Sequence, residues 1–162
     1  MNKQEISFQY QVFNSIKELS NDEKKLIDAA IVAKNNSYSP YSKFKVGVAL
    51  KLDDNIIVTG SNQENAAFPS GLCAERVALF YANANYPDKL IKQIVIVGGK
   101  EDEITLLPLT PCGACRQVLL ESEMRQDYCI EFILVGSQKI YKISNSKVLI
   151  PLSFNQNTLG AK

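Results

Sequence analysis

The chain has 162 residues, 46% of them apolar, which is enough for one globular domain with a buried core. Its 18 basic and 17 acidic residues leave a net charge of +1, which excludes a long-range field that would recruit nucleic acid or an anionic membrane. No segment approaches the roughly 20 apolar residues that span a bilayer. We therefore expect a single cytoplasmic domain over residues 1–162, with a small uncharged substrate and neither nucleic acid nor a membrane as partner.

The first half of the chain shows strand and helix patterns in turn. The expected elements are a strand over residues 7–13, a helix over 22–35 and a hairpin of two strands over 44–52 and 55–60. The helix is capped by Ser20 or Asn21, and its acidic first turn suits the positive end of the helix dipole. Polar and apolar residues alternate in the first strand, as expected for a strand with one buried face.

In the second half, helices and strands again follow one another. The expected elements are a helix over residues 74–85, a strand over 91–97, a helix over 112–123, strands over 130–135 and 139–143, and a helix or turn over 144–149. The strand over 91–97 is a continuous β-branched run bounded by Gly98 and Gly99, which is typical of a strand buried on both faces. Strands interleaved with helices predict a three-layer α/β/α sandwich around a mixed sheet.

Three of the four cysteines lie in two short motifs in a chain without histidine. The motifs are CAER at residues 73–76 and PCGACR at residues 111–116. Cys112 and Cys115 face one side of the first turn of a helix, and Cys73 begins another helix, whose dipole favours a thiolate. Three thiolates leave the fourth position of a tetrahedral zinc ion open to water, as in catalytic sites. We predict one Zn²⁺ per chain, bound by these three cysteines.

Charged residues beside the cysteines suit such a site. Glu75 is too close in sequence to Cys73 to be a comfortable ligand, but near enough to act on the water as general acid and base. Three thiolates around Zn²⁺ give a net charge of about −1, which weakens the metal as a Lewis acid. We expect Arg76, three residues after Cys73, and Arg116, one residue after Cys115, to offset this charge by hydrogen bonding to the sulfurs.

Other interpretations of the cysteines stay open. Cys112 and Cys115 alone also fit a redox pair or half of a structural zinc site. A structural site takes four protein ligands, and the spare cysteine, Cys129, begins an apolar strand, where we expect a core thiol. Cys73 together with Glu75 favours catalysis. A zinc-stabilised binding module, in which Glu75 has no role, is the non-enzymatic alternative.

Four blocks of this sequence resemble the small, zinc-dependent cytidine deaminases that use three cysteine ligands. They are YSKFKVG at residues 41–47, GSNQENA at 60–66, CAER at 73–76 and PCGACRQ at 111–117. The resemblance extends from about residue 22 to residue 154. It implies a mixed five-stranded sheet and the hydrolysis of cytidine and 2′-deoxycytidine to uridine and 2′-deoxyuridine with release of ammonia, as in pyrimidine salvage. Relatives acting on adenine or guanine usually place histidine at the first ligand position, and this chain does not.

The resemblance also implies substrate contacts. Asn62 and Glu64 match a pair that hydrogen-bonds the ribose 3′-hydroxyl, and Phe44 matches an aromatic residue lining the base pocket. Backbone groups near Ala74 and Thr110 are expected to bind the pyrimidine edge. Without the surrounding blocks, Asn62 and Glu64 would be an ordinary polar loop and Phe44 a core strand residue.

Phe154 matches a phenylalanine that family members extend into a neighbouring subunit's active site, which implies a homotetramer; alternatively it covers its own core. Residues 1–20, an extra N-terminal segment, and residues 98–109 are longer than usual for the family. The enzymatic alternative is deamination of another aminopyrimidine compound. Polynucleotide editing is disfavoured because no basic stretch is interleaved with aromatic residues.

Overall fold

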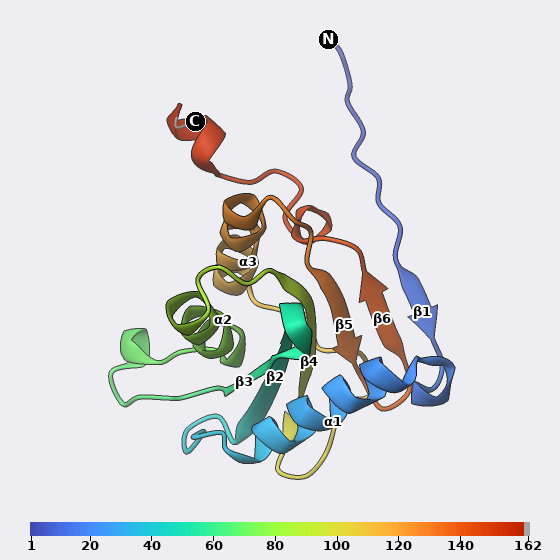
Figure 1. The fold of residues 1–162 in the computed structure, drawn as a ribbon, viewed down its shortest axis with the longest axis vertical. Coiled ribbons are helices and arrows are strands. Elements are labelled where there is room, and N and C mark those ends of the chain that lie inside the picture. Colours follow the sequence, from blue (N-terminus) through green and yellow to red (C-terminus); the bar gives the residue numbers. More distant parts are fainter. Residues whose placement is uncertain (161–162) are drawn as a thin grey trace.

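One mixed sheet of six strands organises the computed structural model, which describes residues 1–160 (Figure 1). The strands are β1 (Gln11–Phe13), β2 (Phe44–Leu52), β3 (Ile57–Ser61), β4 (Ile91–Lys100), β5 (Glu131–Val135) and β6 (Ile140–Ile143), in the order β1-β6-β5-β4-β2-β3. Only β4 and β5 pair in parallel, and the other pairs are antiparallel. The expected mixed sheet is confirmed, with six strands rather than five.

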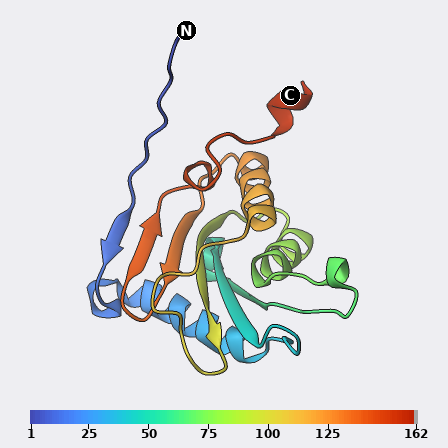
Figure 2. The same cartoon turned by 180° about the vertical axis from the view of Figure 1, so that it is seen from behind.

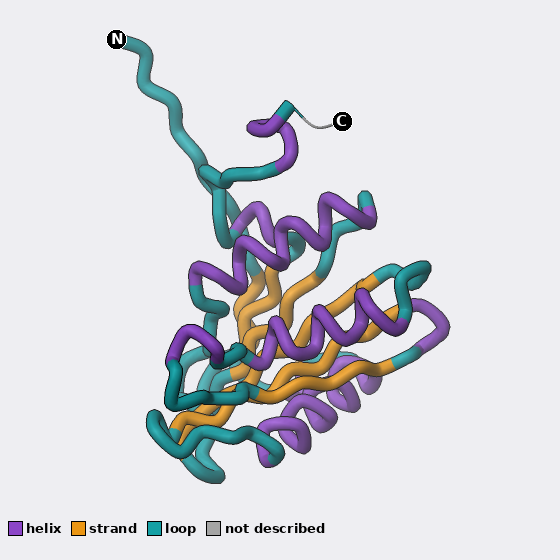
Figure 3. The backbone as a smooth tube through the Cα atoms, turned by 90° about the vertical axis from the view of Figure 1, so that its left-hand side faces the viewer, coloured by secondary structure: helices purple, strands orange, loops and turns teal. Residues whose placement is uncertain are grey.

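Helices cover both faces of the sheet, as the three-layer prediction requires (Figure 3). The helices are α1 (Asn21–Asn35), α2 (Ala74–Asn85) and α3 (Gly113–Gln126). Strand residues alternate between the two layers: Val48 and Leu50 of β2 pack with α2 and α3, whereas Ala49 packs with α1. This period of two divides the core into two apolar layers that lie on opposite faces of one sheet.

Helix α1 begins one residue before the predicted start, and the cause is a capping box. The Ser20 hydroxyl accepts a hydrogen bond from the Glu23 amide, and the Glu23 carboxylate accepts one from the Ser20 amide. The Glu23 carboxylate also pairs with Lys142 on β6, with 2.7 Å between Oε1 and Nζ. The start of α1 is thereby fixed to the sheet that it covers.

Helix α2 lies very close to the sheet because β3 has a glycine, Gly60, where the two elements are in contact. A Cβ atom at Gly60 would lie 2.6 Å from the Ala78 amide nitrogen and 2.7 Å from the Ala74 carbonyl oxygen. Any larger residue at this position would push the first turns of α2 away from the sheet. The observed bounds of α2 match the predicted range of residues 74–85.

Helix α3 extends three residues beyond its predicted end, and β3 begins two residues after its predicted start and ends one residue after its predicted end. Three further differences from the sequence-based expectations depend on tertiary packing. Strand β4 continues to Lys100, because Gly98 and Gly99 leave room for the side chain of Leu109 and the backbone of Glu103 instead of ending the strand. The first strand spans only Gln11–Phe13, since β6 offers partners to those residues alone. Cys129 is exposed rather than in the core; it precedes β5, and the neighbouring Ile130 takes the buried position.

Both chain ends extend from the same end of the molecule (Figures 1 and 3). Residues 1–10 run away from β1 as an extended segment, and the C-terminal segment passes α3 to a short 3₁₀ turn, Gln156–Leu159. Among residues 1–160, no helix has the length and apolar character needed to cross a membrane.

Candidate active site

Three cysteine sulfurs meet where the N-termini of α2 and α3 converge. The Sγ atoms of Cys73, Cys112 and Cys115 lie within 4.8 Å of one another, 3.8 Å apart for Cys73 and Cys112 and 3.5 Å for Cys112 and Cys115. Sulfurs bound tetrahedrally to zinc at 2.3 Å would be about 3.8 Å apart. The donor set therefore fits a zinc ion in both chemistry and spacing.

The secondary structure explains why these three side chains converge. Cys73 is the N-cap of α2, Cys112 is the N-cap of α3, and Cys115 lies in the first turn of α3. Neither cap side chain accepts a backbone hydrogen bond, so both thiols stay free for a metal. Cys115 is buried and Cys112 is exposed, which places the cluster at the boundary between core and solvent.

The thiols of Cys73 and Cys115 have pKa values shifted in opposite directions. The neighbouring Cys115 thiol and the guanidinium of Arg76 lower the pKa of Cys73 to about 5. The pKa of Cys115 is raised, because Cys73 lies beside it and because it is buried. One thiolate is thus present before a metal binds, and metal binding must displace the remaining protons.

Glu75 lies on the first turn of α2, directly beside the cysteines, and only 5% of its surface is exposed. Burial raises the pKa of its carboxyl group, and the nearby Cys73 thiolate acts in the same direction. A carboxyl group with a raised pKa can hold a proton near neutral pH and release it again. The structure therefore brings Glu75 next to Cys73 and Cys115 in a form suited to proton transfer.

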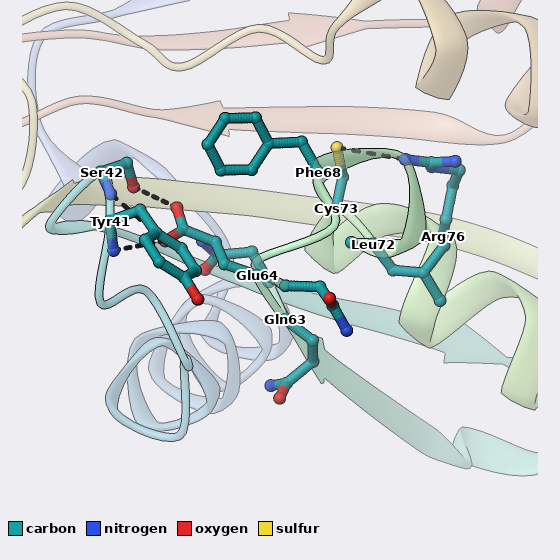
Figure 4. Close-up of a pocket in the computed structure, with 11 residues that line it drawn as sticks. Tyr41, Ser42, Gln63, Glu64, Phe68, Leu72, Cys73 and Arg76 are labelled. Carbon is teal, nitrogen blue, oxygen red and sulfur yellow. Dashed lines mark hydrogen bonds between the residues drawn. The ribbon is translucent and has the colours of Figure 1, made fainter.

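The two arginines next to the ligands make different contacts. Nη2 of Arg76 lies 3.7 Å from the Cys73 sulfur, a contact marked by a dashed line in Figure 4, and its Nε is buried with no hydrogen-bond partner among residues 1–160. Arg116 instead donates to two carbonyl oxygens, those of Pro111 and Leu149, each at 2.9 Å. Its guanidinium therefore holds the segment before Cys112 and the C-terminal segment, rather than a sulfur.

A cavity of about 530 Å³ opens beside Cys73 (Figure 4). Its lining includes Tyr41, Asn62, Glu64, Phe68, Cys73 and Arg76. This volume lies within the usual range for small-molecule sites. The rings of Tyr41 and Phe68 meet edge to face at its rim, with centroids 5.9 Å apart. Sequence reasoning missed Phe68, which lies in a loop between two motifs and carries no periodic signal.

Asn62 and Glu64 face this cavity with much of their hydrogen bonding already used. The Asn62 amide accepts from the Val46 amide at 2.7 Å and from the Ser37 hydroxyl, and donates to the Phe44 carbonyl at 2.9 Å. One N–H of this amide is left for a ligand. The Glu64 carboxylate accepts from the amides of Tyr41 and Ser42 and from the Ser42 hydroxyl, and these bonds lower its pKa.

The other expected substrate contacts lie around the cluster rather than in this cavity. Phe44 lines an adjacent hollow together with residues of the 98–109 segment, and its ring packs over Gly98 beside Leu109. Ala74 is buried beneath the cysteines, and Thr110 is exposed just before Pro111. Phe154 is 58% exposed on the C-terminal segment, where its carbonyl accepts from Gln117 of α3.

Comparisons with known proteins agree with this geometry. Residues 20–131 match the family described as the cytidine and deoxycytidylate deaminase zinc-binding region. A cytidine deaminase from Halalkalibacterium halodurans is 41% identical over 100 residues, which is 62% of this chain and 71% of the relative. A protein named probable cytidine deaminase from Dictyostelium discoideum is 36% identical over 140 residues, covering 86% and 88% of the two chains.

A solved structure extends the similarity to the fold. The crystal structure of cytidine deaminase from Burkholderia pseudomallei superposes with a TM-score of 0.70 and 37% sequence identity, covering 84% of this chain and 100% of the other. On this evidence of sequence, fold and metal-binding geometry, the chain belongs to the zinc-dependent cytidine and deoxycytidylate deaminase family.

Proposed function

We propose that this protein hydrolyses cytidine and 2′-deoxycytidine to uridine and 2′-deoxyuridine, releasing ammonia, in cytoplasmic pyrimidine salvage. One observation carries the proposal: three zinc-compatible sulfurs and a buried glutamate form a cluster whose Cys73 lines a nucleoside-sized cavity. The family assignment and the cytidine deaminases similar to this chain support the same reaction.

Zinc and Glu75 have different tasks in this reaction: the metal would activate the water, and Glu75 transfers the protons. A zinc ion held by Cys73, Cys112 and Cys115 would lower the pKa of a bound water to about 7 and so make hydroxide available as nucleophile at neutral pH. Glu75 accepts a proton from the attacking water and delivers it to N3 of the cytosine ring. It then removes the second proton, from the hydroxyl group now bonded to C4, and passes it to the amino group; the C4–N bond breaks and ammonia leaves. The raised pKa of Glu75 suits both transfers.

The cavity residues orient the nucleoside. Glu64, whose pKa is lowered, remains an acceptor for the ribose 3′-hydroxyl, and the free N–H of Asn62 donates to the same group. From outside this cavity, Phe44 presents a flat apolar wall to the ring, and the backbone at Ala74 and Thr110 presents polar groups to the edge of the ring. Arg76 polarises the Cys73 sulfur and offsets the charge of the thiolates.

The charges of the cavity favour a nucleoside over the nucleotide that the family description also covers. Among its lining residues, the charged side chains are Glu64 and Arg76, and Arg76 already contacts the Cys73 sulfur. A phosphate group would need a free cation or a cluster of N–H donors. We further propose a homotetramer in which Phe154 of one subunit completes the site of a neighbour; its exposure on an extended segment supports this.

An absorbance assay tests the function. Purified protein is given cytidine, 2′-deoxycytidine, cytosine and deoxycytidine monophosphate in turn, with and without a zinc chelator. We expect turnover of the two nucleosides only, lost on chelation and restored by added zinc. A protein that holds about one zinc per chain yet releases no ammonia from cytidine would contradict the proposal and favour another aminopyrimidine compound or a binding role.

A further inference from the structure

The N-terminal arm, residues 1–13 including β1, has the pattern of a longer strand than the chain itself can pair. Apolar and polar residues alternate along it, and Ile6, Phe8, Tyr10 and Val12 are exposed by 56%, 53%, 44% and 45%. The views in Figures 1 and 2 show the arm running away from the body of the molecule. A one-sided apolar strand in this position is typical of a segment that another sheet covers.

Most of the backbone of the arm, like most of its apolar face, has no partner within residues 1–160. Strand β6 pairs with Gln11–Phe13 on one side only, and β1 is the outermost strand of the sheet, so its other edge is open. Within residues 1–160, no hydrogen bond involves the backbone of residues 1–9. Proteins usually protect such edges with lysine or proline, but Glu5 is the only charged residue between Gln4 and Val12.

From this pattern we propose that a second copy of this chain pairs with the arm, antiparallel, across a two-fold axis centred on Phe8. In this register Phe8 faces its own copy, Ile6 faces Tyr10 and Gln4 faces Val12, so the apolar faces coincide. The polar residues also match, with Ser7 opposite Gln9 and Glu5 opposite Gln11. A shift by one residue would set every apolar side chain against a polar one.

Symmetry and charge favour a copy of this chain as the partner. A two-fold axis brings open edge to open edge, so that two six-stranded sheets join into one continuous sheet. No like charges face each other in the register, and the net charge of +1 opposes association only weakly. Aromatic and β-branched pairs across neighbouring strands stabilise such a ladder.

The proposed contact is independent of the catalytic site. The family match begins at residue 20, so the arm lies outside the shared deaminase region. The arm belongs to one edge of the sheet, whereas β3, against which the cysteine-bearing helix α2 packs, forms the other edge. The proposed deaminase function and the proposed pairing of two arms can therefore be tested independently, because assembly through the arm is measured without reference to turnover.

Cysteine crosslinking of the zinc-loaded protein tests the register. In a Cys129→Ser background, which removes the exposed thiol outside the zinc cluster, Phe8→Cys is oxidised mildly or treated with a short bismaleimide. Opposed Cβ atoms at 4.5–5.5 Å are about close enough for a disulfide, so we expect a covalent dimer on a non-reducing gel. The matched control is Gln4→Cys, whose copy would lie about 26 Å away, and we expect it to stay uncrosslinked.

A second variant tests the contact without new thiols. Phe8→Asp sets two carboxylates against each other at the axis, and we expect it to halve the assembly mass in sedimentation relative to the wild type. Phe8 and Gln4, the two arm residues that are substituted, both lie outside the core, so neither change endangers the fold. Equal crosslinking of Phe8→Cys and Gln4→Cys, crosslinking of neither, or an unchanged mass for Phe8→Asp would each overturn the proposal.

Discussion

The proposed metal ligand Cys73 and the proposed proton carrier Glu75 lie two residues apart at the start of α2. Cys73 is the N-cap of α2 and its pKa is lowered, whereas Glu75 is buried in the first turn and its pKa is raised. The neighbouring Cys115 thiol and the Arg76 guanidinium lower the pKa of Cys73, whereas loss of contact with water is the main cause that raises the pKa of Glu75. Each group is thereby suited to its own role.

Replacing Glu75 by glutamine tests its assigned role. Glu75→Gln keeps the shape of the side chain but removes the proton carrier, so turnover of cytidine should fall roughly 10²–10⁴-fold. Zinc content and thermal unfolding should stay at the wild-type level, because the cysteines are unchanged. Activity is measured by absorbance, and zinc by a colorimetric chelator after unfolding.

The matched control for this change is Glu121→Gln on the exposed face of α3, which should behave like the wild type in all three measurements. If Glu75→Gln retained more than about a tenth of wild-type turnover, general acid and base catalysis by this residue would contribute less than the usual range, and its role would have to be reassigned. Loss of zinc in the variant would point instead to a structural role.

At the scale of the element, the first turn of α1 depends on an ionised carboxylate. Burial raises the pKa of Glu23, but hydrogen bonds from Lys142 and Ser20 outweigh it, and the net pKa is lowered. A lowered folded-state pKa means that the carboxylate stabilises the fold above its unfolded pKa of about 4.3. That stabilisation is lost as the pH falls through the lower, folded-state pKa.

Glu23→Gln should therefore reduce the free energy of unfolding by about 1–2 kcal/mol at pH 7, through loss of the ion pair and weakening of the cap. Urea unfolding of variant and wild type at pH 7 and at about pH 3 measures the difference, which should shrink in acid. Comparing the two chains at each pH cancels any loss of zinc common to both. Asp28→Asn, on the exposed face of α1, is the control and should show no such difference. A pH-independent effect would contradict this assignment.

The helices and the metal ligands could be predicted from the sequence because local signals determine them. The cap at Ser20, the bounds of α2 and the spacing of Cys112 and Cys115 all depend on neighbours within a few residues. Features that depend on distant segments were less predictable. Arg116 bonds to the carbonyl of Leu149, 33 positions away, and no local pattern indicates that partner.

Strand ends and exposure show the same dependence on distant residues. The end of β4 was predicted too early because glycine usually interrupts a strand, whereas here Gly98 and Gly99 admit Leu109 and the backbone at Glu103. Cys129 was expected in the core because apolar residues follow it, but strand pairing buries its neighbour Ile130 instead. Tertiary packing decided both outcomes.

At the scale of the whole molecule, apolar residues extend from both chain ends at the same end of the body (Figures 1 and 3). Leu152, Phe154 and Leu159 on the C-terminal segment are exposed by 85%, 58% and 70%. Gln117 of α3 binds the carbonyl of Phe154, so this segment is held in place while the Phe154 ring faces outward. Such an arrangement fits a side chain that acts in another subunit.

Subunit mixing tests whether Phe154 serves a neighbouring site. Phe154→Ala leaves Glu75 intact, and Glu75→Gln leaves Phe154 intact, so each pure variant should turn over cytidine poorly. In a mixed assembly, a Phe154→Ala chain keeps a working Glu75 while an adjacent Glu75→Gln chain supplies the missing ring. Dissociating and reassembling the two variants together should therefore give more activity than the sum of the separate samples.

If Phe154 acts only within its own chain, no mixed assembly contains both groups at one site, and the activities will simply add. Wild type taken through the same procedure controls for losses of activity on reassembly. A mixture of Phe154→Tyr with Glu75→Gln, in which both chains keep an aromatic ring at position 154, controls for the presence of that ring.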